Sequence, residues 1–220
     1  MINVARDIWR IGSLPFWGIN AYLAGDILFD AGTRFESKLF LRKLRGIDLK
    51  MVALTHVHPD HQGAAHAVCE AFHCPLACHE ADRPIMEGTL PMGPPTRAIR
   101  WSSKLFTGPP RHVDRVLSDG EMIGDFRVIH APGHTMGHLI FFRESDRVAI
   151  AGDVCANMHF ITLRPGLREP PKFFSVDRIL NRDSIRALAA LKPDTVLFGH
   201  GRPLRNAREE LLRFVDRLPS

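Results

Sequence analysis

The order of strand and helix patterns along this 220-residue chain predicts an α/β sandwich of two β-sheets with helices on the outside. Strand patterns come first and strand–helix units follow, and the second half of the chain repeats this succession. A single doubly wound sheet would alternate strands and helices throughout. A chain of this length can bury a substantial core, so we expect one domain over residues 1–220.

In the first half, the patterns of apolar residues assign each element. Alternating runs predict three opening strands, with Gly12, Gly18 and Gly25 as turn residues around them. Helical spacing follows, and then a wholly apolar run that is typical of a strand buried on both faces. The expected elements are strands at 8–11, 20–23 and 27–29, a helix over 34–45, a strand at 51–54, a helix over 62–72, a strand at 76–78 and a helix over 80–87.

The second half contains two irregular stretches, residues 88–112 and 157–174. Long loops in a compact domain tend to be lids or binding elements, so we expect both stretches to wall a pocket and set its specificity. The other expected elements are a helical patch over 98–106, strands at 114–117, 126–130, 139–142 and 148–151, a helix over 176–191, a strand at 195–198 and a helix over 207–218.

Composition and charge are those of an ordinary soluble globular protein. Apolar residues make up 45% and charged residues 24% of the chain, and the formal net charge is +5. The sequence has no polybasic run and no long apolar segment, so we expect neither a nucleic acid nor a membrane as partner. The N-terminus lacks the pattern of a secretory signal, which predicts a cytoplasmic protein with reduced cysteines. An anionic small-molecule substrate fits the positive charge, and a homodimer is left open.

One segment carries a dense group of metal-type ligands. Directly after the buried strand ending at Leu54 come His56, His58, Asp60 and His61, three imidazoles and a carboxylate within six residues. Alternate residues of an extended chain point to one face, so His56 and His58 project together. Imidazole and carboxylate groups are ligands that suit zinc. A lone His-x-His pair is often structural, but the added aspartate and histidine favour a metal site.

Three later strands are each expected to lead into a further ligand-type residue. These residues are His134, Asp153 and His200, and each of them lies beside a glycine. Glycine permits unusual backbone dihedrals and a close approach of the chain to an ion. Four strand ends that each present such residues indicate a metal site much more specifically than any one strand end does. We therefore expect all seven side chains to converge.

With this pattern the chain resembles the metallo-β-lactamase-fold superfamily, whose signature is His-x-His-x-Asp-His followed by a distant His, an Asp and another His. The resemblance runs from residues 28–32 to residues 198–201. It implies a four-layer αββα sandwich with the active site along one edge of the two sheets. It also implies a metal-dependent hydrolase that holds two zinc ions, with iron or manganese as alternatives.

The resemblance also assigns roles to residues. It implies a first metal site of His56, His58 and His134, a second of Asp60, His61 and His200, and Asp153 as the carboxylate that bridges them. Asp30 resembles the acid that supports the family's ligands from behind. A metal-bridging hydroxide would be the nucleophile, because paired metal ions lower the pKa of a shared water to roughly 7. Asp60 would ligate its metal and also orient the nucleophile or accept its proton.

Within the superfamily, residues 132–138 and 151–153 are similar to those of the hydroxyacylglutathione hydrolases, or glyoxalase II. The chain ends 20 residues after His200, which leaves room for one helix where those enzymes carry a helical region that helps bind glutathione. We therefore expect a small glyoxalase-II-like hydrolase that acts on a thioester, ester or lactone. Six basic residues of the irregular stretches could meet an anionic substrate or simply be solvated: Arg97, Arg100, Lys104, Arg164, Arg168 and Lys172.

Two other interpretations stay open. A mononuclear iron dioxygenase resembling the persulfide dioxygenases would bind one iron through His56, His134 and Asp153. A non-catalytic metal-binding module would keep the fold without the reaction. Metal analysis would separate the three: two zinc ions, one iron, or none. The roles of three further residues near the expected ligands are left open: His138, His159 and Cys155.

Overall fold

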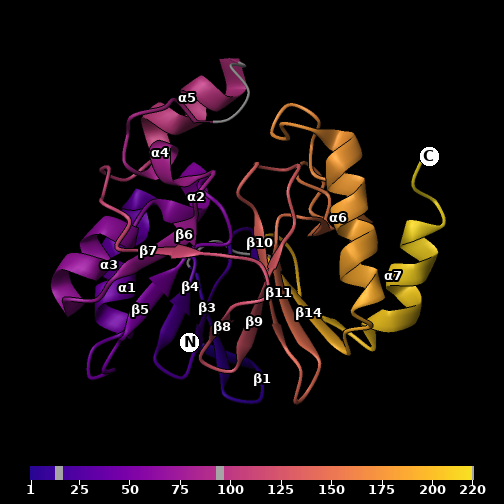
Figure 1. Cartoon of the computed structure of the whole chain (residues 1–220), viewed down its shortest axis with the longest axis horizontal. Coiled ribbons are helices and arrows are strands. Elements are labelled where there is room, and N and C mark those ends of the chain that lie inside the picture. The colour runs from indigo at the N-terminus through magenta and orange to yellow at the C-terminus, as the bar shows by residue number, and fades with distance from the viewer. Residues whose placement is uncertain (13–16, 93–96, 220) are drawn as a thin grey trace.

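In the computed structural model, two β-sheets pack face to face between outer layers of helices (Figure 1). Helices α1 (Ser37–Lys43) and α3 (Ala65–Phe72) lie outside the first sheet, and α6 (Arg178–Ala190) and α7 (Ala207–Val215) lie outside the second. This is the αββα arrangement that the sequence predicts. The residues that the structure describes are 1–12, 17–92 and 97–219.

The first sheet contains seven strands in their order along the chain. Their bounds are β1 Ile2–Ala5, β2 Ile8–Ile11, β3 Ala21–Ala24, β4 Ile27–Phe29, β5 Met51–Ala53, β6 Leu76–His79 and β7 Arg115–Leu117. Strands β1 to β4 pair antiparallel, whereas β4 to β7 pair parallel and therefore need crossover connections. Besides α1 and α3, the crossovers carry the 3-10 helix η2 (Arg34–Glu36), α2 (Pro59–Gln62), α4 (Arg83–Met86) and α5 (Arg97–Phe106).

The second sheet contains six strands in the order β15-β14-β11-β10-β9-β8. Their bounds are β8 Met122–Ile123, β9 Phe126–His130, β10 Leu139–Arg143, β11 Val148–Gly152, β14 Thr195–Phe198 and β15 Leu204–Arg205. Its parallel pair, β11 and β14, is connected through helix α6. A separate two-stranded sheet, β12 (Ala156–Met158) paired with β13 (Pro165–Arg168), follows β11 along the chain.

Apolar side chains from both sheets fill the space between them. The ring centroid of Phe29 lies 4.9 Å from that of Phe126 and 4.8 Å from that of Phe141. Each sheet also packs against its own helices through one further apolar cluster. This cluster lies around Phe40 in the first half and around Ile185 in the second. Close packing on both faces holds the strands rigidly, so the loops at their ends are held in fixed positions as well.

The helix expected over 62–72 differs from the structure, where it is divided in two. Helix α2 already begins at Pro59, and α3 begins only at Ala65. Proline is favoured at the first helical position, because the N–H that it lacks would have no partner there. The division places Asp60 and His61 inside a short helix of their own rather than in the approach to a longer one.

The sequence patterns did not predict several short strands. Strands β1, β8 and β15 lie at sheet edges, and the stretch 157–174, expected to be irregular, contains most of the β12–β13 pair. Strand β13 has no buried residue and contains Pro165 and Gly166, so it lacks the alternation that predicts a strand. None of the helices in the described parts of the chain has the length and apolar character needed to span a membrane.

Candidate metal centre

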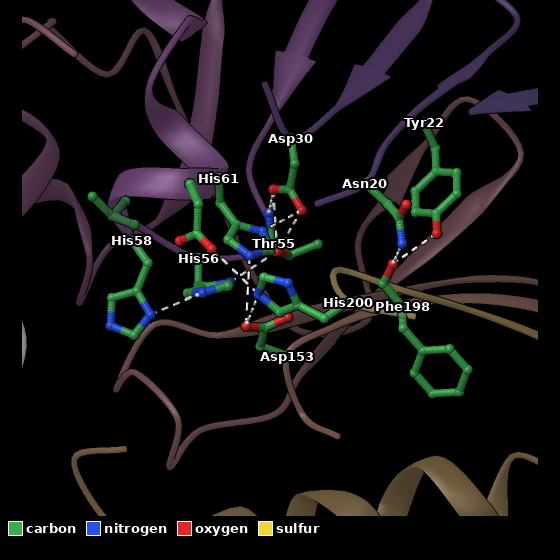
Figure 2. Close-up of polar contacts among 12 residues, drawn as sticks. Asn20, Tyr22, Asp30, Thr55, His56, His58, His61, Asp153, Phe198 and His200 are labelled. Atoms are coloured by element: carbon green, nitrogen blue, oxygen red, sulfur yellow. Dashed lines mark hydrogen bonds and ion pairs between the residues drawn. The ribbon is translucent and has the colours of Figure 1, made fainter. Parts of the chain in front are cut away.

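Four segments bring the expected ligand residues together, and Figure 2 shows His56, His58, His61, Asp153 and His200 among them. The segment after β5, which includes helix α2, carries four of the seven residues, and the loops after β9, β11 and β14 carry one each. Among the described residues, three groups have potential ligand atoms within 4.8 Å of one another: His56, His58 and His134; His56, His61 and Asp153; and Asp60, His61 and His200. All seven side chains therefore converge on one cluster.

The backbone of residues 56–61 divides this segment between the two ends of the cluster. His58 is extended, with φ −109° and ψ 161°, and helix α2 starts directly after it. The extended part presents His56 and His58 toward His134, whereas the helical turn presents Asp60 and His61 toward His200. A change from extended to helical backbone within six residues thus produces two neighbouring ligand groups.

Asp153 lies at the centre of the cluster. Its Oδ2 is 3.1 Å from Nε2 of His200 and 3.6 Å from Nε2 of both His61 and His134. Gly199 makes this approach possible, because a Cβ at that position would lie 2.2 Å from Oδ1 of Asp153. One carboxylate therefore faces both ligand groups.

Asp30 holds His61 from behind the cluster, where the resemblance places a supporting acid. Its buried carboxylate follows strand β4 and accepts hydrogen bonds from the Thr55 backbone N–H at 2.8 Å and from Nδ1 of His61 at 2.9 Å. The Thr55 hydroxyl donates to the same carboxylate. With Nδ1 engaged as a donor, the other ring nitrogen of His61 is left to face the cluster, the arrangement typical of a metal-ligating histidine.

Buried polar atoms without partners test whether the cluster suits a metal ion. Nε2 of His61 and Oδ1 of Asp153 are buried and have no hydrogen-bond partner among the described residues. Nδ1 of His58 faces Nε2 of His56 at 3.1 Å and Nε2 of His134 at 2.9 Å, so three ring nitrogens point at one another. Buried polar atoms are nearly always satisfied, so two unsatisfied atoms beside converging ring nitrogens indicate a missing partner. A cation bound by imidazole and carboxylate groups would satisfy these atoms.

The electrostatics of the cluster also favour a bound metal ion. Burial lowers the pKa of His58 to about 4, and it lowers the pKa of His56 and His134 as well, so these three rings are neutral and keep lone pairs for a metal. Burial alone would also lower the pKa of His200, but Asp153 and Asp60 raise it to about 10. The acidic side of the cluster therefore attracts positive charge, which metal ions would supply.

Two buried residues that the sequence analysis missed hold the His200 loop (Figure 2). Nδ2 of Asn20 donates to the carbonyl oxygens of Phe198 and Gly201, both at 2.9 Å, and the Tyr22 hydroxyl donates to the Phe198 oxygen at 2.7 Å. These bonds join the first sheet to a loop about 180 residues later in the chain. Local sequence carries no signal for such a long-range contact.

Asp82, also missed, ties two ligand loops together. It is 1% exposed, and its carboxylate accepts from the Val57 N–H at 2.9 Å, the Thr135 hydroxyl at 2.8 Å and the Gly137 N–H at 2.9 Å. A Cβ on Gly137 would lie 2.6 Å from the Asp82 carboxylate, so glycine is needed there. In sequence, Asp82 resembles an ordinary helix-capping residue before α4, which hides its role.

The residues whose roles were left open differ in their placement. His138 is buried beside the cluster, where its Nε2 accepts from the Asp153 N–H at 3.0 Å and its ring stacks on that of His56. His159 instead accepts from two backbone N–H groups of its own turn, at 3.1 and 3.2 Å. Cys155 is buried and forms no disulfide. It belongs to none of the groups of potential metal ligands found among the described residues.

A cavity of about 440 Å³ opens over the cluster. Its floor consists of five of the seven ligand residues: His58, Asp60, His134, Asp153 and His200. Both irregular stretches contribute to its walls, the first through Phe106 and the second through Phe160, Pro171 and Phe174. The expectation that these stretches wall a pocket is confirmed.

The basic residues of the same stretches lie elsewhere. Arg97, Lys104, Arg164, Arg168 and Lys172 are exposed, and none of them belongs to the described lining of the cavity. The side chain of Arg100 lies outside the described part of the structure. These side chains therefore give no structural reason to expect an anionic group in the cavity.

Comparison with known proteins identifies the family of this chain. The family described as the metallo-beta-lactamase superfamily matches residues 14–200. The chain is 30% identical over 218 residues to the "Probable metallo-hydrolase YflN" of Bacillus subtilis (strain 168), covering 88% of this chain and 83% of that protein. It is 31% identical over 132 residues to the "Hydroxyacylglutathione hydrolase GloC" of Haemophilus influenzae, covering 54% of this chain and 57% of that one.

A solved structure supports the fold along nearly the whole chain. TTHA1623, crystallised in a di-iron-bound form, superposes with a TM-score of 0.71 at 28% identity and covers 91% of this chain and 96% of that one. The observed sandwich, the cluster at the strand ends and the family match therefore agree. This chain belongs to the metallo-beta-lactamase superfamily.

Proposed function

We propose that this protein uses two metal ions to hydrolyse a small thioester, ester or lactone. Metal-dependent hydrolysis follows from membership of the superfamily and from the metallo-hydrolase name of its relative YflN, whereas the two ions and the substrate class are the proposal. The observation that carries it is the convergence of five histidines and two aspartates on one cluster, of which five residues form the floor of a cavity.

The seven side chains divide between two ions. His56, His58 and His134 would hold one, Asp60, His61 and His200 would hold the other, and Asp153 would contact both. Zinc suits these ligands. Iron and manganese bind the same ligand types, and the di-iron form of TTHA1623 supports iron as the alternative. When bound, such a pair polarises a carbonyl and lowers the pKa of a shared water to roughly 7.

Asp60 is the catalytic residue of this proposal. Its side chain is 29% exposed and lines the cavity, whereas that of Asp153 is 7% exposed. One oxygen of its carboxylate, Oδ2, lies 3.3 Å from Nε2 of His200, and the other would accept a proton from the attacking water. Asp30 fixes the orientation of the His61 ring, and His138 holds the backbone N–H of Asp153 beside the cluster.

The likeness to GloC supports a thioester as substrate, since that relative is named a hydroxyacylglutathione hydrolase. The likeness covers only about half of this chain, so esters and lactones belong to the proposal too. A cytoplasmic location, also proposed, fits the cysteines, because all four are free and buried.

The test is hydrolysis by zinc-loaded protein of a panel of thioesters, esters and lactones. We expect cleavage of at least one class, loss of that cleavage with a chelator and its return with added metal. Asp60→Asn should lower kcat by about 100-fold or more, while Asp125→Asn, at an exposed position remote from the cluster, should leave kcat unchanged. Oxygen uptake by a one-iron protein without hydrolysis would contradict the proposal and favour a dioxygenase that uses His56, His134 and Asp153.

A further inference from the structure

We propose that the substrate carries a bulky, uncharged apolar group beside its scissile carbonyl, and that the phenylalanine-rich walls of the cavity hold this group. The inference rests on the proposed function and adds the class of substrate. The wall residues are Ile19, Phe35, Phe106, Phe160, Pro171 and Phe174.

The apolar walls begin directly beside the metal-type ligands. The ring centroid of Phe160 lies 4.9 Å from that of His200, and the ring centroid of Phe174 lies 6.4 Å from that of His58. A substrate whose carbonyl reaches the cluster must therefore place the adjoining part of its structure between aromatic rings. Aromatic surfaces of this kind bind apolar groups and do not stabilise a charged group.

The walls continue from the cluster toward solvent. Phe35 and Phe106 meet edge to face, with ring centroids 6.0 Å apart, and Phe35 is 61% exposed. The cavity volume of about 440 Å³ lies within the range of small-molecule sites. The same cavity thus has aromatic walls both beside the ligand residues and at an exposed position, so it can accommodate a group of several carbons.

The charges of the lining disfavour an anionic substrate. No lysine or arginine whose side chain the structure describes lines the cavity. The lining does include the buried carboxylate of Glu36, which accepts hydrogen bonds from the N–H and hydroxyl of Thr33. Arg34 lies over the ring of Phe35, but it is not part of the lining. A carboxylate on the acyl group would meet phenyl rings and the Glu36 carboxylate, with no described lysine or arginine of the lining to pair with it.

The reaction balances with water as the only co-reactant. Water adds its oxygen to the acyl carbon, the bond from that carbon to sulfur or oxygen breaks, and the leaving thiol or alcohol takes up a proton. The acyl group leaves as a carboxylate, and the second proton of the water passes to solvent. The walls would contribute binding energy along the acyl group, and each methylene moved from water to an apolar site strengthens binding by about fourfold.

The first test compares acyl groups on one leaving group, for example N-acetylcysteamine thioesters and the matching ethyl esters. We expect kcat/KM to rise by about fourfold per methylene from acetyl to hexanoyl. Butyryl should exceed succinyl, which has the same number of carbons but a carboxylate in place of the terminal methyl group. Equal kcat/KM across the series, or a preference for succinyl, would overturn the inference.

Two wall variants and a matched control locate the effect. Phe106→Ala and Phe174→Ala should lower kcat/KM for the hexanoyl substrate by about tenfold and for the acetyl substrate by much less. Ile161→Ala, which follows Phe160 in the chain but is 87% exposed and outside the lining, should behave as the unchanged protein does. Equal losses for acetyl and hexanoyl substrates in the wall variants would contradict a role in holding the acyl group.

A binding measurement separates this inference from the proposed function. Methyl ketones contain the carbonyl and the chain but no hydrolysable bond, and calorimetry with 2-butanone, 2-hexanone and 2-octanone reports binding alone. We expect Kd to fall by about fourfold per methylene, and the fall to be reduced in Phe174→Ala. Hydrolysis without chain-length dependence in either assay would contradict the acyl-binding role of the cavity but not the hydrolase activity. Tight ketone binding without any hydrolysis would contradict the hydrolase activity but not the acyl-binding role.

Discussion

Asp82 and Thr135 form a buried hydrogen bond of 2.8 Å that links the two halves of the sandwich beside the metal-type cluster. Asp82 comes from the first half of the chain and also accepts from the Val57 N–H, between His56 and His58. Thr135 follows His134 in the second half. One carboxylate thus sets the spacing between ligands that come from different sheets.

Removal of this carboxylate should destabilise the protein. Asp82→Ala leaves three buried donors without an acceptor, and we expect the free energy of unfolding to fall by on the order of 3 kcal/mol. Thr135→Val removes one of the three bonds and should lower it by about 1 kcal/mol. Chemical denaturation measures both. The exposed Asp125→Ala is the control, and an Asp82→Ala curve that overlies it would show that the link is unimportant.

Asp30→Asn should weaken one metal site selectively. The carboxylate accepts from both Thr55 and Nδ1 of His61, and an amide cannot accept equally from both sides. His61 then loses the partner that keeps Nε2 free for a metal, and we expect the affinity of one of the two ions to fall by about 10- to 100-fold. Competition with a chromogenic chelator measures this affinity. Asp26→Asn, at an exposed position, is the control, and unchanged affinity of both ions in Asp30→Asn would refute the assigned role.

Metal uptake at neutral pH should release protons. Burial opposes a proton on His61 and His200, but Asp153 and the neighbouring carboxylates raise both pKa values, that of His200 to about 10. Below these pKa values both rings are protonated on both nitrogens and must lose one proton to bind a metal, so metal affinity should rise with pH up to the pKa of His200, about 10. His58, with a pKa of about 4, has no such proton to release.

Calorimetry at pH 7 in two buffers of different ionisation enthalpy counts the released protons. We expect at least one from each of the two histidines when both sites fill. A binding heat that is independent of the buffer would mean that His61 and His200 are neutral before the metal arrives.

Asn20→Ala should loosen the loop that carries His200. Two backbone carbonyls on either side of His200 lose their donor, and we expect a loss of about 2 kcal/mol in the free energy of unfolding together with weaker metal binding. Tyr22→Phe removes only the bond to Phe198 and should cost about 1 kcal/mol. Thermal unfolding with and without metal measures both. Equal effects of the two variants would contradict the larger role given to Asn20.

The sequence predicted which seven side chains converge because their signals are local. His56, His58, Asp60 and His61 lie within six residues, and the other three follow runs whose apolar patterns predict buried strands. The sheets then bring these strand ends to one edge for reasons of packing rather than of metal binding. The αββα architecture and the convergence of the cluster were accessible in this way.

The supporting residues could not be found in the same way. Asp82, Asn20 and Tyr22 act through bonds that span 25 to 181 positions of the chain, and neither their types nor their spacing differ from those of ordinary strand and cap residues. The β12–β13 pair was missed because a short exposed strand with Pro165 and Gly166 has no apolar alternation. Tertiary contacts, not local preference, determine these features.

The central claim is that seven side chains hold two metal ions, and the metal content of the purified protein tests it most directly. Elemental analysis after loading with zinc and removal of unbound metal by gel filtration should find two ions per chain, and fewer in Asp153→Asn, which alters the carboxylate that faces both ligand groups. A single ion per chain, or none, would contradict the account.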